Sequence, residues 1–296
     1  MQLTFLGTSC MMPTKERNPS AAYLDYKRDG ILFDCAEGTQ RQIRIAGLNL
    51  AKITKILISH WHGDHVLGLP GLLLTIASLN LAHGVDIYGP EGSKKAFKQM
   101  FGGIAFETKF NITVTEVSEG KFYENNDYYL ESAPMKHSVP CVAYSFCEKD
   151  RRRINVSAIS KLGIPEGPLL GKLARGESIE WNGKKIEPDK VTRIVRGRKI
   201  TFITDTRPNK NCKKIARNSD VLVIDSTYTS ELKEKAEEHG HLTALEAAQI
   251  ASQANVKKLV LTHFSARYKD THPLEEDAKT AFNNVVAAYD FMRLKI

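Results

Sequence analysis

Ile56-Leu57-Ile58-Ser59-His60-Trp61-His62-Gly63-Asp64-His65 is the most informative stretch of this chain. It begins as an apolar run typical of a buried strand and continues with three imidazoles and one carboxylate in six residues. Alternate side chains of an extended segment share a face, so His60 and His62 can reach one ion at roughly 2.0–2.1 Å. Asp64 and His65 follow Gly63, where the chain can bend back and offer a second set of donors. The spacing therefore predicts a metal site and favours two adjacent ions over one.

A solvated histidine-rich turn is the alternative interpretation of this stretch. The apolar strand before it and the run Val66-Leu67-Gly68-Leu69-Pro70 after it disfavour such a turn. The six residues from His60 to His65 resemble the HxHxDH signature of the metallo-β-lactamase superfamily. That resemblance implies an α/β fold, the αβ/βα sandwich in which two facing mixed sheets are flanked by helices, and it implies further ligands far downstream.

Three candidates for these ligands stand in the expected order, His137, Asp205 and His263. Each follows an apolar run, and strand ends are where side chains of an α/β fold converge on a site. The resemblance implies two ligand sets and one bridging residue: His60, His62 and His137 for one metal, Asp64, His65 and His263 for the other, and Asp205 between them. Such ligands suit two Zn²⁺ ions, and Mn²⁺ or Fe would also fit. A metal pair of this kind activates water and stabilises charge on a leaving group, which implies hydrolysis.

Length and composition set limits on the class of protein. The 296 residues allow one large domain or two small ones. No run reaches the ~18 consecutive apolar residues of a membrane span, so no membrane partner is expected. The first residues, Met1 to Gly7, lack a charged n-region and a cleavage site, so we expect a cytoplasmic protein. The five cysteines form no CxxC pair, and we expect them to be reduced, mostly buried and not metal ligands.

The distribution of charge points to a polyanionic partner. The formal net charge is +8, and the positive excess is concentrated between Lys149 and Lys199. This segment is also rich in Gly and Pro and has little apolar periodicity. We therefore expect residues 1–296 to form a single domain that carries a basic, flexible arm inserted at residues 150–198.

The remaining chain alternates between strand and helix patterns. Short apolar or alternating runs bounded by turn residues predict strands, and longer runs with helical spacing predict helices. The predicted strands are 3–6, 22–26, 31–33, 87–89, 200–204, 221–225 and 258–262, with three or four more between 111 and 147. The predicted helices are 38–46, 66–79, 91–100, 209–217, 243–253 and 274–287.

Three further motifs resemble those of the ribonuclease Z family, endonucleases that remove 3′ trailers from transfer RNA precursors. Pro13-Thr14-Lys15-Glu16-Arg17-Asn18 resembles the family's PxKxRN loop. The ten residues from Phe33 to Gln42 resemble a second signature, with Ala36 where glycine is usual. Gly167-Pro168-Leu169-Leu170-Gly171-Lys172-Leu173 is similar to the Gly-Pro motif of the flexible arm with which the family binds transfer RNA.

This resemblance implies RNA-binding roles for several residues. Lys15 and Arg17 would hold phosphates at the 3′ end of the acceptor stem. Gly167, Pro168 and Gly171 would belong to an arm that grips the elbow of transfer RNA, although a solvated basic loop is the alternative. Arg267 would contact an RNA phosphate, and a surface salt bridge would explain it nearly as well.

The resemblance also implies roles beside the metals. His241 matches the histidine of the family's late His-Ser-Thr segment, with Leu242 as a departure. It would donate a proton to the leaving 3′ oxygen or stabilise the phosphorane, and the alternative is a helix-cap neighbour without chemistry. Asp225 takes the glutamate position of the His-Glu-Ala-Thr motif, whose histidine is replaced here by Ile224, and would orient His241. Asp64 would also accept a proton from the attacking water.

Asp34 has two equal explanations, either as a carboxylate that orients a ligand histidine or as a buried turn cap. Together the motifs predict a zinc-dependent endoribonuclease that leaves a 3′-hydroxyl on the transfer RNA and a 5′-phosphate on the trailer. A small-molecule phosphodiesterase or arylsulfatase on the same scaffold is one alternative, but it would make no use of the basic arm. A noncatalytic RNA-binding subunit is another, which the seven ligand candidates disfavour. The resemblance also implies a homodimer in which the arm of one subunit serves the active site of the other.

Overall fold

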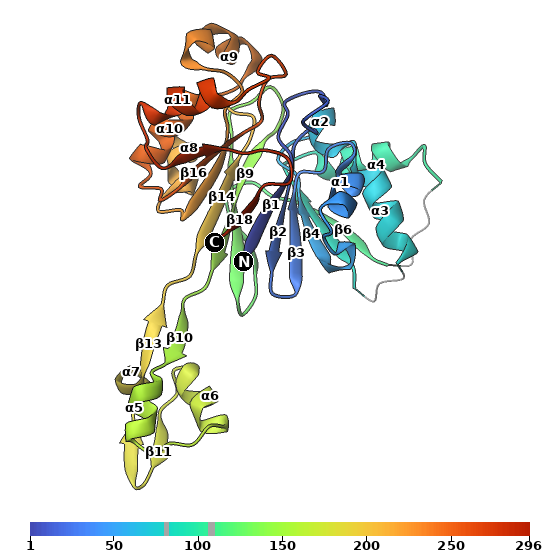
Figure 1. Ribbon diagram of the computed structural model, residues 1–296. Coiled ribbons are helices and arrows are strands. Elements are labelled where there is room, and N and C mark those ends of the chain that lie inside the picture. Colours follow the sequence, from blue (N-terminus) through green and yellow to red (C-terminus); the bar gives the residue numbers. More distant parts are fainter. Residues whose placement is uncertain (80–82, 106–109) are drawn as a thin grey trace. The chain divides into compact units, whose positions relative to one another are not determined.

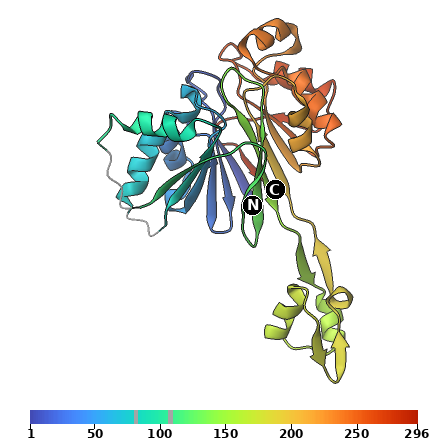
Figure 2. The same ribbon diagram turned by 180° about the vertical axis from the view of Figure 1, so that it is seen from behind.

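The computed structural model describes residues 1–79, 83–105 and 110–296. The chain forms two compact units, whose elements are drawn in Figure 1 and, from behind, in Figure 2. Unit 1 contains Met1–Tyr123, Leu130–Phe146 and Lys199–Ile296, and unit 2 contains Glu124–Tyr129 and Cys147–Arg198. The segment predicted as an inserted arm, residues 150–198, lies within unit 2.

Two seven-stranded sheets organise unit 1. Sheet A has the strand order β18-β1-β2-β3-β4-β5-β6, and sheet B has the order β17-β16-β15-β14-β9-β8-β7. The strands of sheet A are β1 (Gln2–Gly7), β2 (Ala21–Tyr26), β3 (Asp29–Phe33), β4 (Ile53–Leu57), β5 (Val85–Gly89), β6 (Ile112–Glu116) and β18 (Arg293–Lys295). Those of sheet B are β7 (Gly120–Glu124), β8 (Tyr128–Pro134), β9 (Val142–Glu148), β14 (Lys199–Ile203), β15 (Val221–Asp225), β16 (Leu259–Thr262) and β17 (Val285–Ala287).

Helices cover the outer face of each sheet (Figure 1). On sheet A these are α1 (Thr39–Ile45), α3 (Leu69–Ser78) and α4 (Ser93–Phe101), and on sheet B they are α8 (Lys210–Ala216), α10 (Ala244–Gln253) and α11 (His272–Lys279). Buried Leu and Ile side chains of α3 join the core under sheet A, and buried alanines of α10 join the core under sheet B. Among the residues that the structure describes, no helix is long and apolar enough to cross a membrane.

The inner faces of the two sheets pack together through aromatic side chains. Phe33 of β3 stacks on Phe202 of β14 with ring centroids 3.6 Å apart, and Tyr26 of β2 meets Phe146 of β9 edge-on at 4.9 Å. Sheet A is mixed, because β1, β2 and β3 pair antiparallel and β3 to β6 pair parallel. The predicted sandwich of two facing sheets flanked by helices is confirmed.

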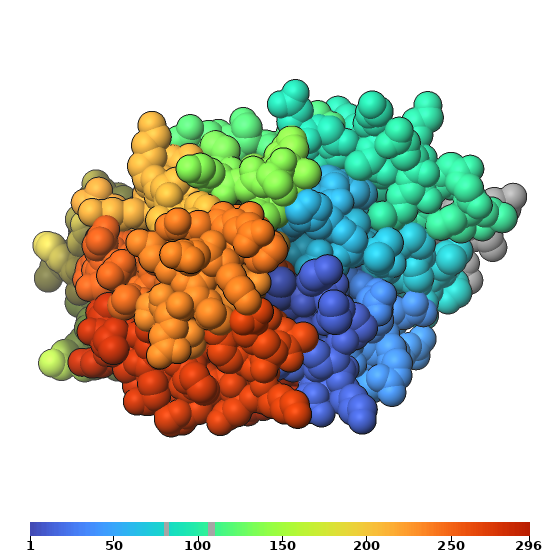
Figure 3. All heavy atoms as spheres, turned by 90° about the horizontal axis from the view of Figure 1, so that it is seen from above, coloured from blue at the N-terminus to red at the C-terminus, as the bar shows by residue number. Residues whose placement is uncertain are grey.

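Parallel pairing brings the ends of several strands to one edge of the sandwich. In sheet A, β3 and β4 end there, and in sheet B the parallel strands β14, β15 and β16 do. Figure 3 looks down on this edge, where a dark-blue segment from the early part of the chain lies between the red and light-blue segments. Loops from both sheets therefore meet at this edge, which is where the chemistry-bearing residues follow their strands.

Two predicted helices differ from the observed ones. The run at 66–79 forms a short α2 (Gly63–Val66) and then α3, because the backbone of Gly68 approaches Ala36 so closely that a Cβ would lie 1.9 Å from its carbonyl oxygen. Pro70 sits in the first turn of α3, where its missing N–H costs nothing. The helix predicted at 274–287 ends at Lys279, since residues 285–287 pair with β16 as the parallel strand β17. Helix α9 (Lys233–His239) and the 3-10 turns η1 (Leu50–Lys52) and η2 (Ser230–Leu232) are additional elements.

Unit 2 has more regular structure than its Gly- and Pro-rich sequence predicts. It contains β10 (Arg151–Ile154), α5 (Val156–Lys161), α6 (Pro168–Ala174), β11 (Ile179–Trp181), β12 (Lys184–Ile186), α7 (Pro188–Val191) and β13 (Thr192–Val195). A small apolar core of its own holds Ile159, Ile164, Leu173, Ile179, Ile186 and Val191. Trp181 packs against this core and donates from Nε1 to the carbonyl oxygen of Leu162 over 2.9 Å.

Candidate metal centre

All seven predicted ligands follow strand ends, five of them on loops and two, Asp64 and His65, in the short helix α2. Sheet A supplies the segment after β4, with His60, His62, Asp64 and His65. Sheet B supplies His137 after β8, Asp205 after β14 and His263 after β16. The side chains gather in two groups that share Asp205: His60, His62, His137 and Asp205, and Asp64, His65, Asp205 and His263. The structure therefore brings together residues that are up to 203 positions apart in the chain, from His60 to His263.

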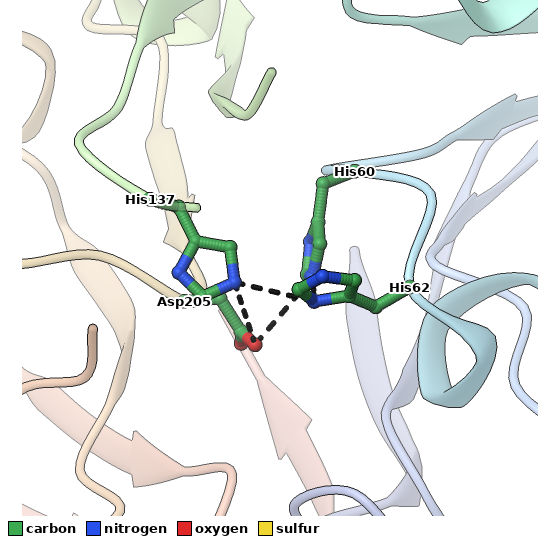
Figure 4. A group of neighbouring side chains, drawn as sticks. All are labelled: His60, His62, His137 and Asp205. Atoms are coloured by element: carbon green, nitrogen blue, oxygen red, sulfur yellow. Dashed lines mark hydrogen bonds and ion pairs between the residues drawn. The ribbon is translucent and has the colours of Figure 1, made fainter. Parts of the chain in front are cut away.

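The first group joins donors from both sheets (Figure 4). Nδ1 of His62 lies 3.0 Å from Nε2 of His60 and 3.2 Å from Nε2 of His137. Oδ2 of Asp205 lies 3.6 Å from Nε2 of His60 and 4.0 Å from Nε2 of His137. Ligands held at about 2.0–2.1 Å around a tetrahedral ion are about 3.3 Å apart. The spacing of these four atoms is thus close to that of ligands around one ion.

The second group, Asp64, His65, Asp205 and His263, contains two carboxylates and two imidazoles. Oδ2 of Asp64 lies 3.5 Å from Nε2 of both His65 and His263. Asp205 reaches His65 with Oδ2 at 3.5 Å and His263 with Oδ1 at 3.2 Å. One carboxylate therefore contributes to both groups, as a bridging ligand would.

Unsatisfied buried atoms test whether a cation fits here. Nε2 of His65, Nε2 of His263 and Oδ1 of Asp205 are buried and have no hydrogen-bond partner among the residues that the structure describes. A buried polar atom left unsatisfied costs about 1–3 kcal/mol, and a cation among these three would remove that cost. Imidazole nitrogens and carboxylate oxygens are ligands for divalent ions. The residues present fit a divalent metal centre.

The outward-facing nitrogens of the rings are held by other groups. Nδ1 of His65 donates to Asp34 over 2.7 Å, and the hydroxyl of Ser59 bridges Nδ1 of His60 and Asp34 at 3.0 and 2.9 Å. Asp34 also accepts from the backbone N–H of Ser59 over 2.7 Å, so it both orients a histidine and caps the turn. On sheet B, Nδ1 of His137 donates to the carbonyl oxygen of Gly240 over 3.3 Å. Such partners fix which ring nitrogen faces inward.

Three residues of the centre have left-handed backbone conformations. The φ angles are +54° for Asp34, +49° for Asp205 and +63° for His263. Each residue follows the end of a strand, and each lies in a backbone region that residues other than glycine adopt uncommonly, with Asn, Asp and His the most frequent among them. The left-handed conformation turns each side chain from its strand into the site.

His241 and Asp225 form a hydrogen-bonded pair beside the second group. Nδ1 of His241 donates to Oδ2 of Asp225 over 3.1 Å, which leaves Nε2 of His241 free of that partner. Burial alone would lower the pKa of His241, but the charge of Asp225 raises it to about 10. Burial would raise the pKa of Asp225, and His241 outweighs it, so that this pKa lies below its usual range. The pair therefore consists of a protonated His241 imidazole and a charged Asp225 carboxylate, each of which stabilises the other.

A cavity of about 490 Å³ opens over the metal centre. Its lining includes Asp64, His137 and His241 of the predicted site. Cys10 and Tyr228 also line it, and the sequence analysis did not select them as site residues. A substrate in this cavity would lie against both metal groups and the His241–Asp225 pair.

Cys10 is the cysteine whose surroundings differ from the expectation. Cys35, Cys141, Cys147 and Cys212 are buried, as predicted, whereas Cys10 is half-buried and lies with its Sγ within 4.8 Å of nitrogens of His241 and His263. The available signal was its position beside the Pro13–Asn18 loop. Its neighbour Met11 donates its backbone N–H to Oδ2 of Asp64 over 2.7 Å, which ties this loop to the centre.

The chain shares its sequence pattern with known proteins over its full length. Residues 1–153 match the family described as Anti-Pycsar protein Apyc1, and residues 180–264 match the Beta-lactamase superfamily domain. The chain is 42% identical to ribonuclease Z of Archaeoglobus fulgidus, over 100% of this chain and 97% of that relative. It is 36% identical to ribonuclease Z of Bacillus velezensis, over 100% of this chain and 99% of that relative.

The chain belongs to the ribonuclease Z family. A solved structure agrees with this relationship. Human tRNase Z, short form, has a TM-score of 0.73 and 27% sequence identity, over 100% of this chain and 99% of that chain. The comparison of sequences and the comparison of structures therefore lead to the same family.

The residues that match the ribonuclease Z loop motif have different surroundings. Lys15 is exposed, whereas Arg17 is 9% exposed and donates to the carbonyl oxygen of Tyr268. Arg17 therefore holds the Pro13–Asn18 loop to the segment after β16, and its guanidinium is largely buried. Arg267 is exposed, with its guanidinium carbon 5.3 Å from the ring centre of Tyr228.

The Gly-Pro motif of the ribonuclease Z arm lies in unit 2. Gly167 precedes α6 and Pro168 occupies its first turn, and both are exposed. Gly167 has φ of +146°, a conformation that favours glycine. Gly171 lies one turn further along α6. The motif thus begins a helix on the surface of unit 2.

Proposed function

We propose that this chain is a metal-dependent endoribonuclease that removes the 3′ trailer from transfer RNA precursors. The observation that carries the proposal is the convergence of the seven donors beside the His241–Asp225 pair, with an open cavity lined by Asp64, His137 and His241 over them. The full-length similarity to proteins named ribonuclease Z supports the choice of RNA as the substrate. The reaction breaks the bond between phosphorus and the 3′ oxygen, and leaves a 3′-hydroxyl on the transfer RNA and a 5′-phosphate on the trailer.

The proposed cofactors are two Zn²⁺ ions, one in each donor group, with Asp205 shared. Imidazole-rich sites suit zinc, and Mn²⁺ or Fe would use the same residues. When bound, such a pair supplies an activated water and neutralises charge on the phosphate. The ligand assignment is the predicted one: His60, His62 and His137 on one side, Asp64, His65 and His263 on the other.

The chain's own residues would move the protons. Asp64, which lines the cavity, accepts a proton from the attacking water. His241 is held by Asp225 through Nδ1, so its Nε2–H is available to protonate the leaving 3′ oxygen. A proton at this oxygen removes the need to expel a free alkoxide, which is the poor leaving group of this reaction.

RNA binding belongs to the same proposal. Lys15 and Arg267 are exposed and could contact phosphates, while Arg17 would act mainly by shaping its loop. The basic unit 2 would bind transfer RNA through the region of Gly167, Pro168 and Gly171. The protein would be a homodimer in which the arm of each subunit serves the active site of the other. We place the enzyme in the cytoplasm, with precursor transfer RNA as its partner.

A comparison of substrates tests this proposal. Protein stripped of metal with a chelator and reloaded with Zn²⁺ is incubated with a 3′-extended precursor and, separately, with bis(p-nitrophenyl) phosphate. We expect chelator-sensitive cleavage of the precursor that the Asp64→Ala variant lacks. Turnover of the small phosphodiester without any cleavage of the precursor would favour the small-molecule phosphodiesterase instead.

A further inference from the structure

Arg207 is a charged residue that the proposed chemistry does not use and that is nevertheless largely buried. It lies two residues after Asp205, in the loop between β14 and α8, and its side chain is 13% exposed. A guanidinium cannot lose its charge at any ordinary pH, so burying it requires partners. Its side-chain partners are the carbonyl oxygen of His241, Glu246 in the first turn of α10, and Glu237 of α9, to whose Oε1 its Nη2 donates over 3.3 Å.

The guanidinium of Arg207 makes a forked contact with Glu246 and a further contact with the loop that carries His241. Nη1 and Nη2 donate to the two carboxylate oxygens of Glu246 over 2.9 and 2.8 Å. Nη1 also donates to the backbone carbonyl oxygen of His241. Glu246 is 14% exposed and accepts at Oε2 from the backbone N–H of Thr243, whose hydroxyl in turn caps α10. One planar group therefore fixes both ends of the segment from His241 to Glu246.

The backbone of the same residue contacts the loop that carries His137. The N–H of Arg207 donates to the carbonyl oxygen of Lys136 over 3.0 Å. His137 in turn contacts the loop of His241, because its Nδ1 donates to the carbonyl oxygen of Gly240, the residue directly before His241. Three loops that carry His137, Asp205 and His241 are thus joined in a ring of contacts, with Arg207 in two of its three links.

We propose that Arg207, held by Glu246, is a positioning residue that sets the place of His241 over the leaving oxygen. This inference rests on the proposed function of the metal centre. Asp225 orients the His241 ring at Nδ1 and accepts from the backbone N–H of Leu242 over 3.2 Å. Arg207 holds the carbonyl oxygen of His241, the other polar atom of the same peptide group. Lysine could not replace it, because a single ammonium cannot hold two carboxylate oxygens and a carbonyl in one plane.

The test separates a role through His241 from a role in metal binding or folding. Arg207→Gln and Glu246→Gln are compared with the wild type on a 3′-extended precursor and on bis(p-nitrophenyl) phosphate. Nitrophenolate leaves without a proton donor, so its release does not depend on His241. Glu246→Gln keeps a capping side chain at its helix position, which protects α10. Arg28→Gln, at an exposed arginine in the turn between β2 and β3, is the matched control.

We expect Arg207→Gln to lower kcat for the precursor by about 10- to 100-fold with little change in KM. Glu246→Gln should show the same pattern with a smaller loss, and Arg28→Gln should match the wild type. Hydrolysis of the small phosphodiester and metal content should stay close to wild type in all three. Equal losses on both substrates would overturn the proposal, because Arg207 would then serve the metal centre or the fold, and so would an unchanged kcat for the precursor.

A double-mutant cycle sharpens the result. In the His241→Ala background, Arg207→Gln should cause no further loss of precursor cleavage, because its route of action is already gone. A loss of the same factor in both backgrounds would contradict a role through His241. If the wild type itself failed to cut the precursor, the proposed function would fall first, and that outcome is distinct from any difference among the variants.

Discussion

His241 and Asp225 show how the chemistry depends on single side chains. The family motif has glutamate where this chain has Asp225, and the shorter carboxylate still reaches Nδ1 of His241 at 3.1 Å. It also accepts from the backbone N–H of Leu242 over 3.2 Å, on the residue that departs from the motif. The contact on which the proposed proton donation depends is thus kept despite two departures in sequence, because the loop brings the pair together.

The charge of Asp225 predicts a pH dependence. Since the pKa of His241 is raised to about 10, its ordinary value being 6.5, the imidazole stays protonated through neutrality. By the same linkage, the stabilisation from this pair is complete below pH 6.5 and is lost as the pH rises through about 10. In Asp225→Asn the raising charge is gone while burial remains, so the pKa of His241 should fall.

Single-turnover cleavage of a precursor between pH 6 and 9.5 measures this effect. We expect a wild-type rate that does not decline on the alkaline side over this range, and an Asp225→Asn rate that falls once the pH exceeds roughly 6.5, the ordinary value for histidine. Asp25→Asn, at a surface acid paired with Lys52, serves as the control. A flat profile for Asp225→Asn would show that the carboxylate does not keep His241 protonated.

The cluster of candidate ligands was predictable at this scale, whereas the neighbouring residues Cys10 and Arg207 were not. The spacing of His60, His62 and His65 within one short segment predicts a metal site, and Asp34 is indicated by its place in a motif. Arg207 has no local signal. Cys10 has only its position beside the Pro13–Asn18 loop, since it meets His241 and His263 only after the chain has folded across more than 230 positions. Arg17 illustrates the converse, because its motif suggests a phosphate contact and its side chain is largely buried on the carbonyl of Tyr268.

At the scale of elements, buried strands hold the ligands in place. β16 is buried at each of its four positions and leads directly into His263. Its neighbours β15 and β17 pair with it in parallel register on both sides. The strand was predictable from its apolar run. The end of the last helix was not, because β17 depends on pairing with β16 rather than on local propensity.

A core substitution in β16 should show what the strand contributes. Leu261 is fully buried in the core under sheet B, so Leu261→Ala should lower the free energy of unfolding by about 2–5 kcal/mol. Leu79→Ala, at a side chain 39% exposed, should change it by less than about 0.5 kcal/mol. Denaturant titration of metal-free protein measures both. Similar values for the two variants would mean that β16 is not a stability-determining strand.

Unit 2 is an element with its own apolar core, and its removal can be designed without disturbing sheet B. The N–H of Glu148 donates to the carbonyl oxygen of Arg198 over 2.9 Å, so the chain enters and leaves the unit at neighbouring points. Residues 150–198 can therefore be replaced by a two-residue Asn-Gly turn. We expect weaker precursor binding and a shallower dependence of binding on salt, because fewer phosphates are neutralised.

Hydrolysis of bis(p-nitrophenyl) phosphate by the same deletion variant is the control and should be unchanged. Binding is followed by filter retention at several salt concentrations. If binding and small-substrate hydrolysis were lost together, residues 150–198 would be part of the active site or of the fold rather than a separate RNA-binding arm.

At the scale of the whole molecule, the proposed homodimer predicts complementation between defective subunits. One variant, Asp64→Ala, keeps the arm and lacks a working centre, and the deletion of 150–198 does the reverse. If each arm serves the other subunit, mixing the two should restore about a quarter of the wild-type cleavage rate, because half of randomly exchanged dimers are mixed and each has one complete site. No gain over the separate variants, despite subunit exchange shown by size and labelling, would contradict the shared arrangement.

The central claim is that this metal centre cuts a transfer RNA precursor at the start of its trailer. Mapping the cut in a 3′-extended precursor, with the chemical ends of both products identified, tests it most directly. The account predicts one metal-dependent cut beside the discriminator nucleotide, with a 3′-hydroxyl on the transfer RNA and a 5′-phosphate on the trailer. A 2′,3′-cyclic phosphate at the cut, or nucleotides released one at a time from the 3′ end, would contradict it.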